Sequence, residues 1–300
     1  MITKKKIAIC YSGQTRHLNE YPEFTDDWYN ILDLFNEFDC DLYGHTWEDQ
    51  ATPNDDILKN FKVFEKTNQD DIWDTIKLMP NLGFWDFMPE ARDWHLKQEY
   101  QDIINNKGDF ITFAKARING TLGQLWSAHE CFHLIKADAH WPDYEYVVRL
   151  RWDLNSKFAN TTQNQIMLLR DQFKDALRNY ARDRHQNPLA STRTARYGDF
   201  NSSDILATDI LYNGNNNTPF VNDHVFVIKG ISFLQSRISK KTPIEVFSHM
   251  ARNTNCGFPT SHTLWVQWFE HFNLHLQTAL PDITSGNGSS DGKENKYWRI

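Results

Sequence analysis

The sequence predicts an α/β fold in which helices cover a mostly parallel central sheet. The first 47 residues read as a strand, a helix and a second strand, a unit whose crossover connection is right-handed in nearly all proteins. Strongly apolar strands follow at 144–156 and 219–230, each after a long intervening segment. Because 300 residues fit one large domain, we expect one hydrophobic core region rather than separate domains.

The first three elements have clear patterns. Ile7 to Tyr11 is a short apolar run that ends in a glycine turn, as expected of a buried parallel strand. Residues 21–38 have apolar side chains at helical spacing, with Pro22 near the start. The segment CDLYGHTW, residues 40–47, is the second strand and ends in a histidine and a tryptophan.

The middle of the chain is less regular. Residues 50–112 lack periodicity and are rich in Asp, Trp and Pro, which indicates an insertion whose fold the pattern does not define. Helical spacing returns from Thr121 to Ala137, and YEYVVRLRWDLNS, residues 144–156, is the strongest strand pattern. Residues 160–218 are polar and rich in Arg and Asn, so they are expected to be mostly loop.

The last part of the chain predicts a strand at 219–230 and an apolar-faced helix at 258–272. A Gly/Ser tract at 282–300 reads as a flexible tail that ends in aromatic and basic residues. We therefore expect a single domain over residues 1–300, with insertions at about 50–112 and 160–218.

Composition excludes some function classes. The formal net charge is −7, and no long basic stripe occurs, which disfavours a mainly electrostatic grip on nucleic acid. No apolar run approaches the roughly 20 residues that span a bilayer, so membrane contact would be peripheral. Four widely spaced cysteines without a C-x-x-C pair, and no leader before them, indicate reduced thiols and a cytoplasmic location. The 14% aromatic content fits either sugar or base stacking platforms or a large core.

The strand VVRLRWDL contains charged residues that require an explanation. A period of two places Arg149, Arg151 and Asp153 on one face, opposite Val148 and Leu150. Two guanidinium groups on a core strand need partners, which are either carboxylates or the anionic groups of a ligand. Asp153 lies where the strand ends, where α/β sheets bind ligands, and its carboxylate could hold a hard divalent cation. A simple Arg–Asp ion pair is the alternative.

The turn after the first strand is a candidate phosphate site at the same sheet edge. Gly13 lets the backbone approach a ligand, Ser12 and Gln14 supply hydrogen bonds, and Arg16 could contact a diphosphate. The pattern S-G-Q-x-R is weak on its own, and an ordinary surface turn has the same composition.

Other candidates are an aspartate and several histidines. Asp223 precedes an apolar strand, where it could act as a general base or simply occupy a turn. His45, at the end of a strand, suits a ligand site. His129 and His133 share an apolar helix face and are expected to be packed, while His262 could be a ligand or a capping residue. No G-x-S-x-G nucleophile elbow of a serine hydrolase is present.

The order of these motifs resembles a glycosyltransferase family found in bacterial polysaccharide clusters and large phages. S-G-Q-x-R, H-T-W, R-x-R-x-D and N-D occur in that order between residue 6 and about 272. The resemblance implies a nucleotide-sugar-dependent transferase with a single GT-A-like, Rossmann-like domain. It implies that Ser12, Gly13, Gln14 and Arg16 line the nucleotide and diphosphate site. It also implies that Arg149, Arg151 and Asp153 bind the phosphates, with Asp153 as the candidate metal ligand, and that Asp223 faces the acceptor. His45, in the H-T-W motif, is a further candidate for binding the donor.

This sequence departs from the resemblance in one respect. It has D-x-N in place of D-x-D, which leaves a requirement for Mn²⁺ or Mg²⁺ open, because arginines can also neutralise a leaving diphosphate. Lys296 and Arg299 in the tail could close over that diphosphate, or they could belong to a packed terminus.

The predicted function is transfer of a sugar from a nucleotide-diphosphate donor to a hydroxyl acceptor, either a glycan or a modified DNA base. For the latter, the Arg-rich stretch 178–196 could form a local contact. Two alternatives remain. A sugar-phosphate nucleotidyltransferase would need a longer Gly-rich, basic signature after the first strand, and a non-enzymatic carbohydrate-binding module would use the tryptophans as platforms.

Overall fold

The structure is a computed structural model of the chain. It describes residues 4–15, 23–78, 110–152, 171–177, 205–207, 210–213, 218–221, 225–230, 241–253, 261–272 and 276–278, together with Phe233 and Leu274.

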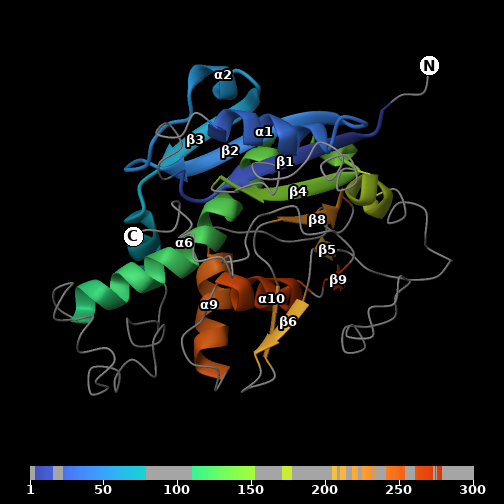
Figure 1. The fold of residues 1–300 in the computed structure, drawn as a ribbon. Helices are drawn as coiled ribbons and strands as arrows, with labels where there is room; N and C mark the ends of the chain where they lie inside the picture. Colours follow the sequence, from blue (N-terminus) through green and yellow to red (C-terminus); the bar gives the residue numbers. More distant parts are fainter. Residues whose placement is uncertain are drawn as a thin grey trace, which may run out of the picture.

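A seven-stranded sheet with the order β3-β2-β1-β4-β8-β5-β9 forms the centre of the molecule (Figure 1). Its strands are β1 (Lys6–Ser12), β2 (Asp39–Trp47), β3 (Phe61–Thr67), β4 (Tyr146–Arg151), β5 (Ile205–Ala207), β8 (Val225–Lys229) and β9 (Leu276–Thr278). The four strands from β3 to β4 are parallel, β8 is antiparallel to both of its neighbours, and β5 pairs parallel with β9. The predicted α/β class with a mostly parallel sheet is confirmed.

Helices lie on both faces of the sheet (Figure 1). The described helices include α1 (Glu23–Asp33), α2 (Asp55–Leu58), α3 (Asp71–Lys77), α6 (Phe110–Ala137), α9 (Thr242–Asn253) and α10 (Ser261–His271), with a short 3-10 helix at Trp141–Asp143. A separate antiparallel hairpin consists of β6 (Ile210–Asn213) and β7 (Thr218–Val221). None of the described helices is long and apolar enough to cross a membrane.

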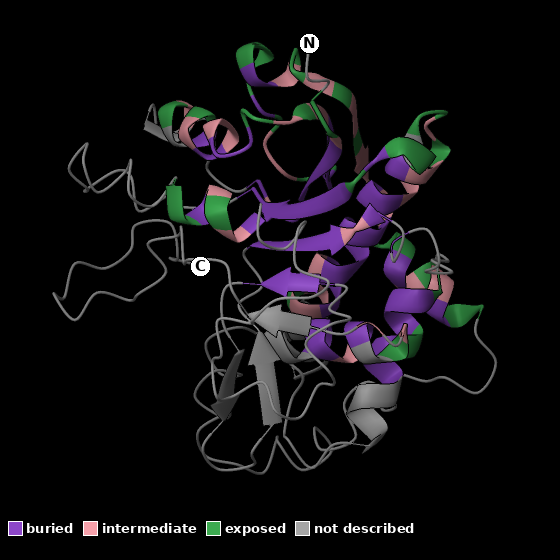
Figure 2. Cartoon of the chain, turned by 90° about the vertical axis from the view of Figure 1, so that its right-hand side faces the viewer, coloured by how far each residue is buried: buried purple, intermediate pink, exposed green. Residues whose placement is uncertain are grey.

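Two apolar layers sandwich the sheet, and buried residues follow its strands (Figure 2). On one face, Ile7, Ile9 and Tyr11 of β1 pack with α1 and with residues 171–177. On the other face, Ala8 and Cys10 pack with α6, α9 and α10. Successive residues of a strand point to opposite faces, so each strand contributes to both layers. The continuous apolar runs in the sequence follow from burial on both faces.

Several predicted elements differ from the observed ones. The helix predicted over 21–38 ends at Asp33, because the next turns form i to i−3 hydrogen bonds such as Phe35 N to Leu32 O. The helix predicted from Thr121 begins at Phe110 and includes Gly120 in its interior. The strand predicted over 219–230 is divided between β7 and β8, which belong to different sheets.

Other elements were not predicted. Residues 50–112, expected to be an insertion, contain β3, a strand at the sheet edge. Its side chains are mostly half-buried, so it lacks the apolar run that identified β1. Strand β5 lies within the segment 160–218, and α9 lies in a segment for which no helix was predicted.

Candidate functional site

The order in which the chain adds strands to the sheet reverses at β1. From β1 the sheet continues through β2 to β3 on one side, whereas β4 lies on the other side of β1. Ligands of open α/β sheets bind outside the carboxyl ends of the strands at such a reversal. Ser12, the last residue of β1, pairs with Arg151 of β4 on one side and with His45 of β2 on the other. Three predicted site residues therefore form one row across the sheet edge.

The turn after β1 is fixed by side chains from other elements. Gly13 has a φ of 112°, a conformation that residues with a Cβ rarely adopt. Its backbone N–H donates to Ser127 Oγ of α6 over 2.8 Å, and its carbonyl accepts a hydrogen bond of 2.9 Å from Thr46 Oγ1 of β2. The hydroxyl of Thr15 donates to the carbonyl of Ala51. The turn is therefore anchored to α6, to β2 and to the backbone at residue 51.

The described residues leave space open beside this turn. Gly13 is buried, yet no heavy atom of the described residues lies within 4 Å of the position that a Cβ on it would occupy. At Gly44, by contrast, a Cβ would lie 2.7 Å from Phe64 and 3.0 Å from Trp152. Gly44 is thus required by packing, whereas Gly13 is required by its backbone conformation and borders room that a ligand could fill.

His45 lies beneath the turn and is fully buried. Its Nδ1 is 2.7 Å from Ser127 Oγ, and its Nε2 is 3.0 Å from Thr67 Oγ1. Burial lowers the pKa of His45 to about 3, so the ring is neutral at physiological pH. Both ring nitrogens contact protein hydroxyls, and the structure therefore places His45 behind the turn as a support for Ser127.

The two arginines of β4 occupy different environments. The predicted alternation is confirmed, because Val148, Leu150 and Trp152 belong to the layer opposite Arg149. Arg149 is fully buried, its Nε donates to Ser12 Oγ over 3.3 Å, and its guanidinium lies 5.3 Å from the ring centre of Trp265. Arg151 is 5% exposed at the end of the strand, next to Ser12. Arg149 thus supports Ser12 from below, and Arg151 lies at the edge itself.

Several predicted residues fall outside the described part of the chain: Arg16, Asp153, Asp223, Lys296, Arg299 and the stretch 178–196, as does the side chain of His262. Gln14 is described and half-buried in the turn. Among the described residues, no group of three His, Cys, Asp or Glu side chains could hold a metal ion. His129 is packed as predicted, and its Nε2 accepts a hydrogen bond from the indole of Trp268.

Sequence reasoning missed Ser127, Thr46 and Thr67. Ser127 is a small hydroxyl residue in the apolar helix segment QLWSAHECF. From the sequence it could not be distinguished from a small residue that only fills space in the core. One signal was available, since a polar residue within an apolar helix face is expected to have a buried hydrogen-bond partner.

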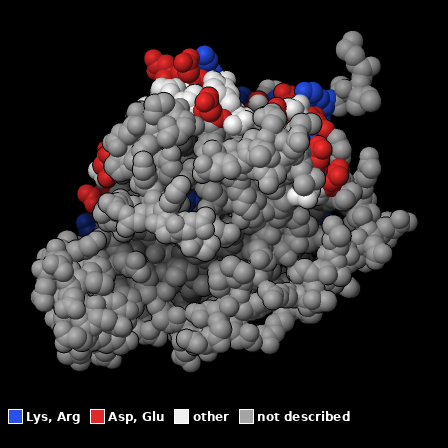
Figure 3. Space-filling model, in the orientation of Figure 1, with Lys and Arg blue, Asp and Glu red and all other residues white. Residues whose placement is uncertain are grey.

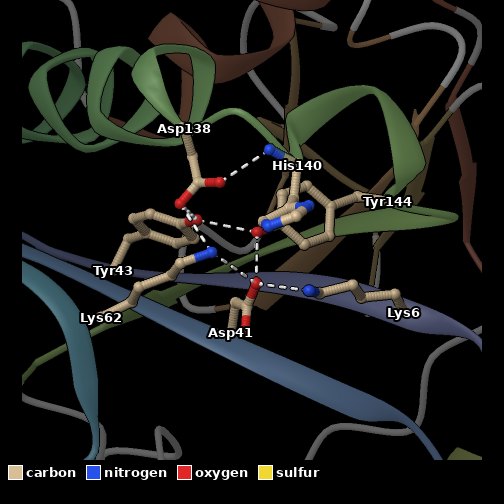
Figure 4. Close-up of polar contacts among 7 residues, drawn as sticks. All are labelled: Lys6, Asp41, Tyr43, Lys62, Asp138, His140 and Tyr144. Atoms are coloured by element: carbon tan, nitrogen blue, oxygen red, sulfur yellow. Dashed lines mark hydrogen bonds and ion pairs between the residues drawn. The ribbon is translucent and has the colours of Figure 1, made fainter.

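A second polar cluster lies at the opposite, amino-terminal edge of the sheet, where charges of both signs meet (Figure 4). It consists of Lys6, Asp41, Tyr43, Lys62, Asp138, His140 and Tyr144. Lys62 Nζ lies 3.2 Å from Asp41 and 2.7 Å from Asp138, and the Tyr144 hydroxyl donates to Asp41 over 2.6 Å. Burial alone would raise the pKa of Asp138, but Lys62, the backbone N–H of His140 and Tyr43 lower it to about 2.

Charges of both signs also alternate on the described surface. Figure 3 shows acidic and basic side chains side by side near α1 and α2. Asp56 and Lys59 of this region form an exposed pair at 2.8 Å.

Comparisons with known proteins identify no family for the chain. No family model matches it, and no curated protein is significantly similar to it in sequence. Among solved structures, the apo form of mouse xyloside xylosyltransferase 1 is similar over 91% of this chain and 84% of that chain, with 9% identity and a TM-score of 0.35. The α/β fold is defined by the strand order of the sheet itself.

Proposed function

We propose that the chain is a glycosyltransferase that moves a sugar from a nucleoside-diphosphate donor to a hydroxyl acceptor. One observation carries the proposal: the anchored Gly13 turn lies at the chain reversal between β1 and β4, next to Arg151, and borders space that the described residues leave open. A turn without a side chain allows the close backbone approach that a diphosphate requires, and a guanidinium can contact two phosphate oxygens at once.

The proposed roles of Gly13, Arg151 and Arg149 follow from where these residues lie, and the proposed role of Asp223 follows from the sequence alone. The diphosphate would occupy the space beside Gly13, with Arg151 neutralising its charge as the donor bond breaks. The acceptor oxygen would bond to the anomeric carbon as the bond from that carbon to the diphosphate oxygen breaks. The acceptor proton would pass to Asp223, and the nucleoside diphosphate would leave. Arg149 acts indirectly in this proposal, by holding the Ser12 hydroxyl.

A divalent cation is part of the proposal only through Asp153. Its carboxylate follows β4 directly after Trp152, so a hard cation such as Mn²⁺ or Mg²⁺ there would add positive charge near the diphosphate. Arg151 provides positive charge at the same edge without a metal. Chelation of divalent cations therefore tests whether the metal is required or whether the arginine suffices.

The same proposal covers the acceptor and the compartment. We propose a glycan, or a modified DNA base, as the acceptor and the cytoplasm as the location. Cys10, Cys40 and Cys131 are free thiols, which agrees with a reducing compartment.

A matched pair of glycine variants tests the proposed site. Gly13 and Gly120 both border open space among the described residues, but only Gly13 has a positive φ. Gly13→Ala should strain the turn and weaken binding of nucleoside diphosphates about 5- to 150-fold, because strained backbone costs about 1–3 kcal/mol. Gly120→Ala, in the helix, should leave binding unchanged and raise stability by about 1 kcal/mol.

Isothermal titration calorimetry with UDP, GDP, CDP and ADP, each with Mn²⁺ and with chelator, measures these affinities. A transfer assay with the matching sugar nucleotides then tests catalysis. Binding of glycans without any nucleotide would instead indicate a carbohydrate-binding module. Turnover of a nucleoside triphosphate with a sugar phosphate would indicate a nucleotidyltransferase.

A further inference from the structure

We propose that Ser127 is a positioning residue that holds the Gly13 turn ready for the diphosphate, with His45 and Thr67 fixing the Ser127 hydroxyl. This inference rests on the proposed function and adds a residue from α6 that the motifs of the first strand do not include. Ser127 is fully buried, 114 residues away from Gly13 in sequence. Its hydroxyl, on α6, accepts a hydrogen bond from the backbone of the turn.

The hydrogen bonds of Ser127 define one consistent set of donors and acceptors. Its Oγ accepts the Gly13 N–H over 2.8 Å, which leaves a lone pair and one proton for other partners. The shorter remaining contact is 2.7 Å to His45 Nδ1, whereas the His45 carbonyl is 3.4 Å away. When Ser127 donates to Nδ1, the His45 Nε2–H donates to Thr67 Oγ1 over 3.0 Å.

These hydrogen bonds connect residues of three elements to the backbone N–H of Gly13, which follows a fourth element. Thr67 is on β3, His45 is on β2, Ser127 is on α6, and Gly13 follows β1. The carbonyl of Gly13 is held separately by Thr46, so Ser127 is the partner of the N–H alone. Without the Ser127 hydroxyl, a buried N–H would lose its acceptor, and the turn would gain alternative conformations. Binding then includes the cost of ordering the turn, which lowers affinity.

The test compares Ser127→Ala with Tyr43→Phe. Tyr43 is a fully buried residue on β2, faces the same layer, and its hydroxyl bonds to Asp138 and Tyr144 at the opposite edge. Both variants remove one buried hydroxyl, so both should lower the melting temperature. Only Ser127→Ala should raise the Kd, by about tenfold, for whichever of UDP, GDP, CDP and ADP the wild type binds best. Tyr43→Phe should stay within twofold of wild type.

Amide hydrogen exchange gives a readout that does not depend on a ligand. In Ser127→Ala the Gly13 amide should exchange at least about tenfold faster than in wild type, whereas in Tyr43→Phe it should not change. Ser127→Thr retains the hydroxyl and should restore slow exchange. Equal Kd values for Ser127→Ala and Tyr43→Phe would overturn the inference while leaving the proposed function intact.

The two proposals fail in different ways. If the wild type binds no nucleoside diphosphate with or without Mn²⁺, the proposed function is wrong and the diphosphate part of this inference falls with it. The exchange measurement then tests only whether Ser127 anchors the turn. Unchanged exchange at Gly13 in Ser127→Ala overturns the positioning role, and faster exchange supports it.

Discussion

The two edges of the sheet carry different charges. At the amino-terminal edge, Lys62 contacts two carboxylates. At the chain reversal, Arg149 and Arg151 are the described charged side chains that β1 and β4 contribute. The first cluster balances charge within itself, because Lys6 and Lys62 meet Asp41 and Asp138. At the reversal, the hydrogen bonds include those of the neutral His45 ring with two hydroxyl groups and one from Arg149 to the Ser12 hydroxyl.

The difference indicates what each edge contributes. Paired charges of opposite sign stabilise the fold, and because their electrostatic potentials largely cancel, they attract a charged ligand only weakly. A fixed turn with open space and a neighbouring guanidinium is instead suited to an anionic ligand. We therefore expect substitutions at the amino edge to change stability alone and substitutions at the reversal to change ligand affinity. Three experiments test this division.

The largest expected effect is on nucleotide affinity. Arg151→Ala should weaken nucleoside diphosphate binding by about 100-fold, because a hydrogen bond to a charged group is worth about 1.5–3 kcal/mol. Lys62→Ala removes an equal charge from the other edge and should lower stability without changing the Kd. Calorimetric titration of both variants measures this contrast. Comparable losses of affinity in the two variants would contradict the division between the edges.

The second effect is the pH dependence of stability. Folded His45 has a pKa of about 3, and in the unfolded chain it titrates near 6.5. Between these values the unfolded chain binds the extra proton, so the free energy of unfolding should fall as pH decreases, by up to about 1.4 kcal/mol per pH unit. The stability from His45 is thus fully present above about pH 6.5.

Urea unfolding of wild type and His45→Gln at pH 7.5, 6.5 and 5.5 isolates this contribution. The wild type should lose more stability across this range than the variant. The carboxylates of the amino edge respond at lower pH, since the Asp138 pKa of about 2 lies below its ordinary value near 4. Parallel curves for the two proteins would mean that His45 gains no proton on unfolding.

The smallest effect concerns the amino edge alone. Tyr144→Phe removes the 2.6 Å hydrogen bond to Asp41 and should lower stability by about 1 kcal/mol. For a chain of this size, the melting temperature should fall by about 2–4 °C. The Kd for nucleoside diphosphates should equal that of wild type. A change in affinity would show that the two edges are coupled through the sheet.

Some site residues were predictable from local pattern. The period of two in VVRLRWDL placed Arg149 and Arg151 together, and the structure confirms that they share a face. The change to small polar residues at Ser12 and Gly13 predicted a strand from Ile7 to Tyr11, and β1 extends one residue further at each end. Both inferences depend on neighbours in sequence, which is why they needed no knowledge of packing.

Other features could not be found in this way. Strand β8 reads like any buried strand, and its antiparallel direction depends on how the chain returns to the sheet. His45 was predicted as a ligand-binding residue, and its contacts with Ser127 and Thr67 became apparent only when α6 and β3 were placed beside β2.

The sequence by itself determined strands β1, β2 and β4 and which side chains of β4 share a face, because side-chain alternation is a property of the extended backbone. Only the tertiary structure decided that β4 lies beside β1 and that Ser127 meets Gly13 across 114 residues. The physical reason is that pairing between distant segments depends on which arrangement buries both apolar layers of the sheet and satisfies the polar groups between them.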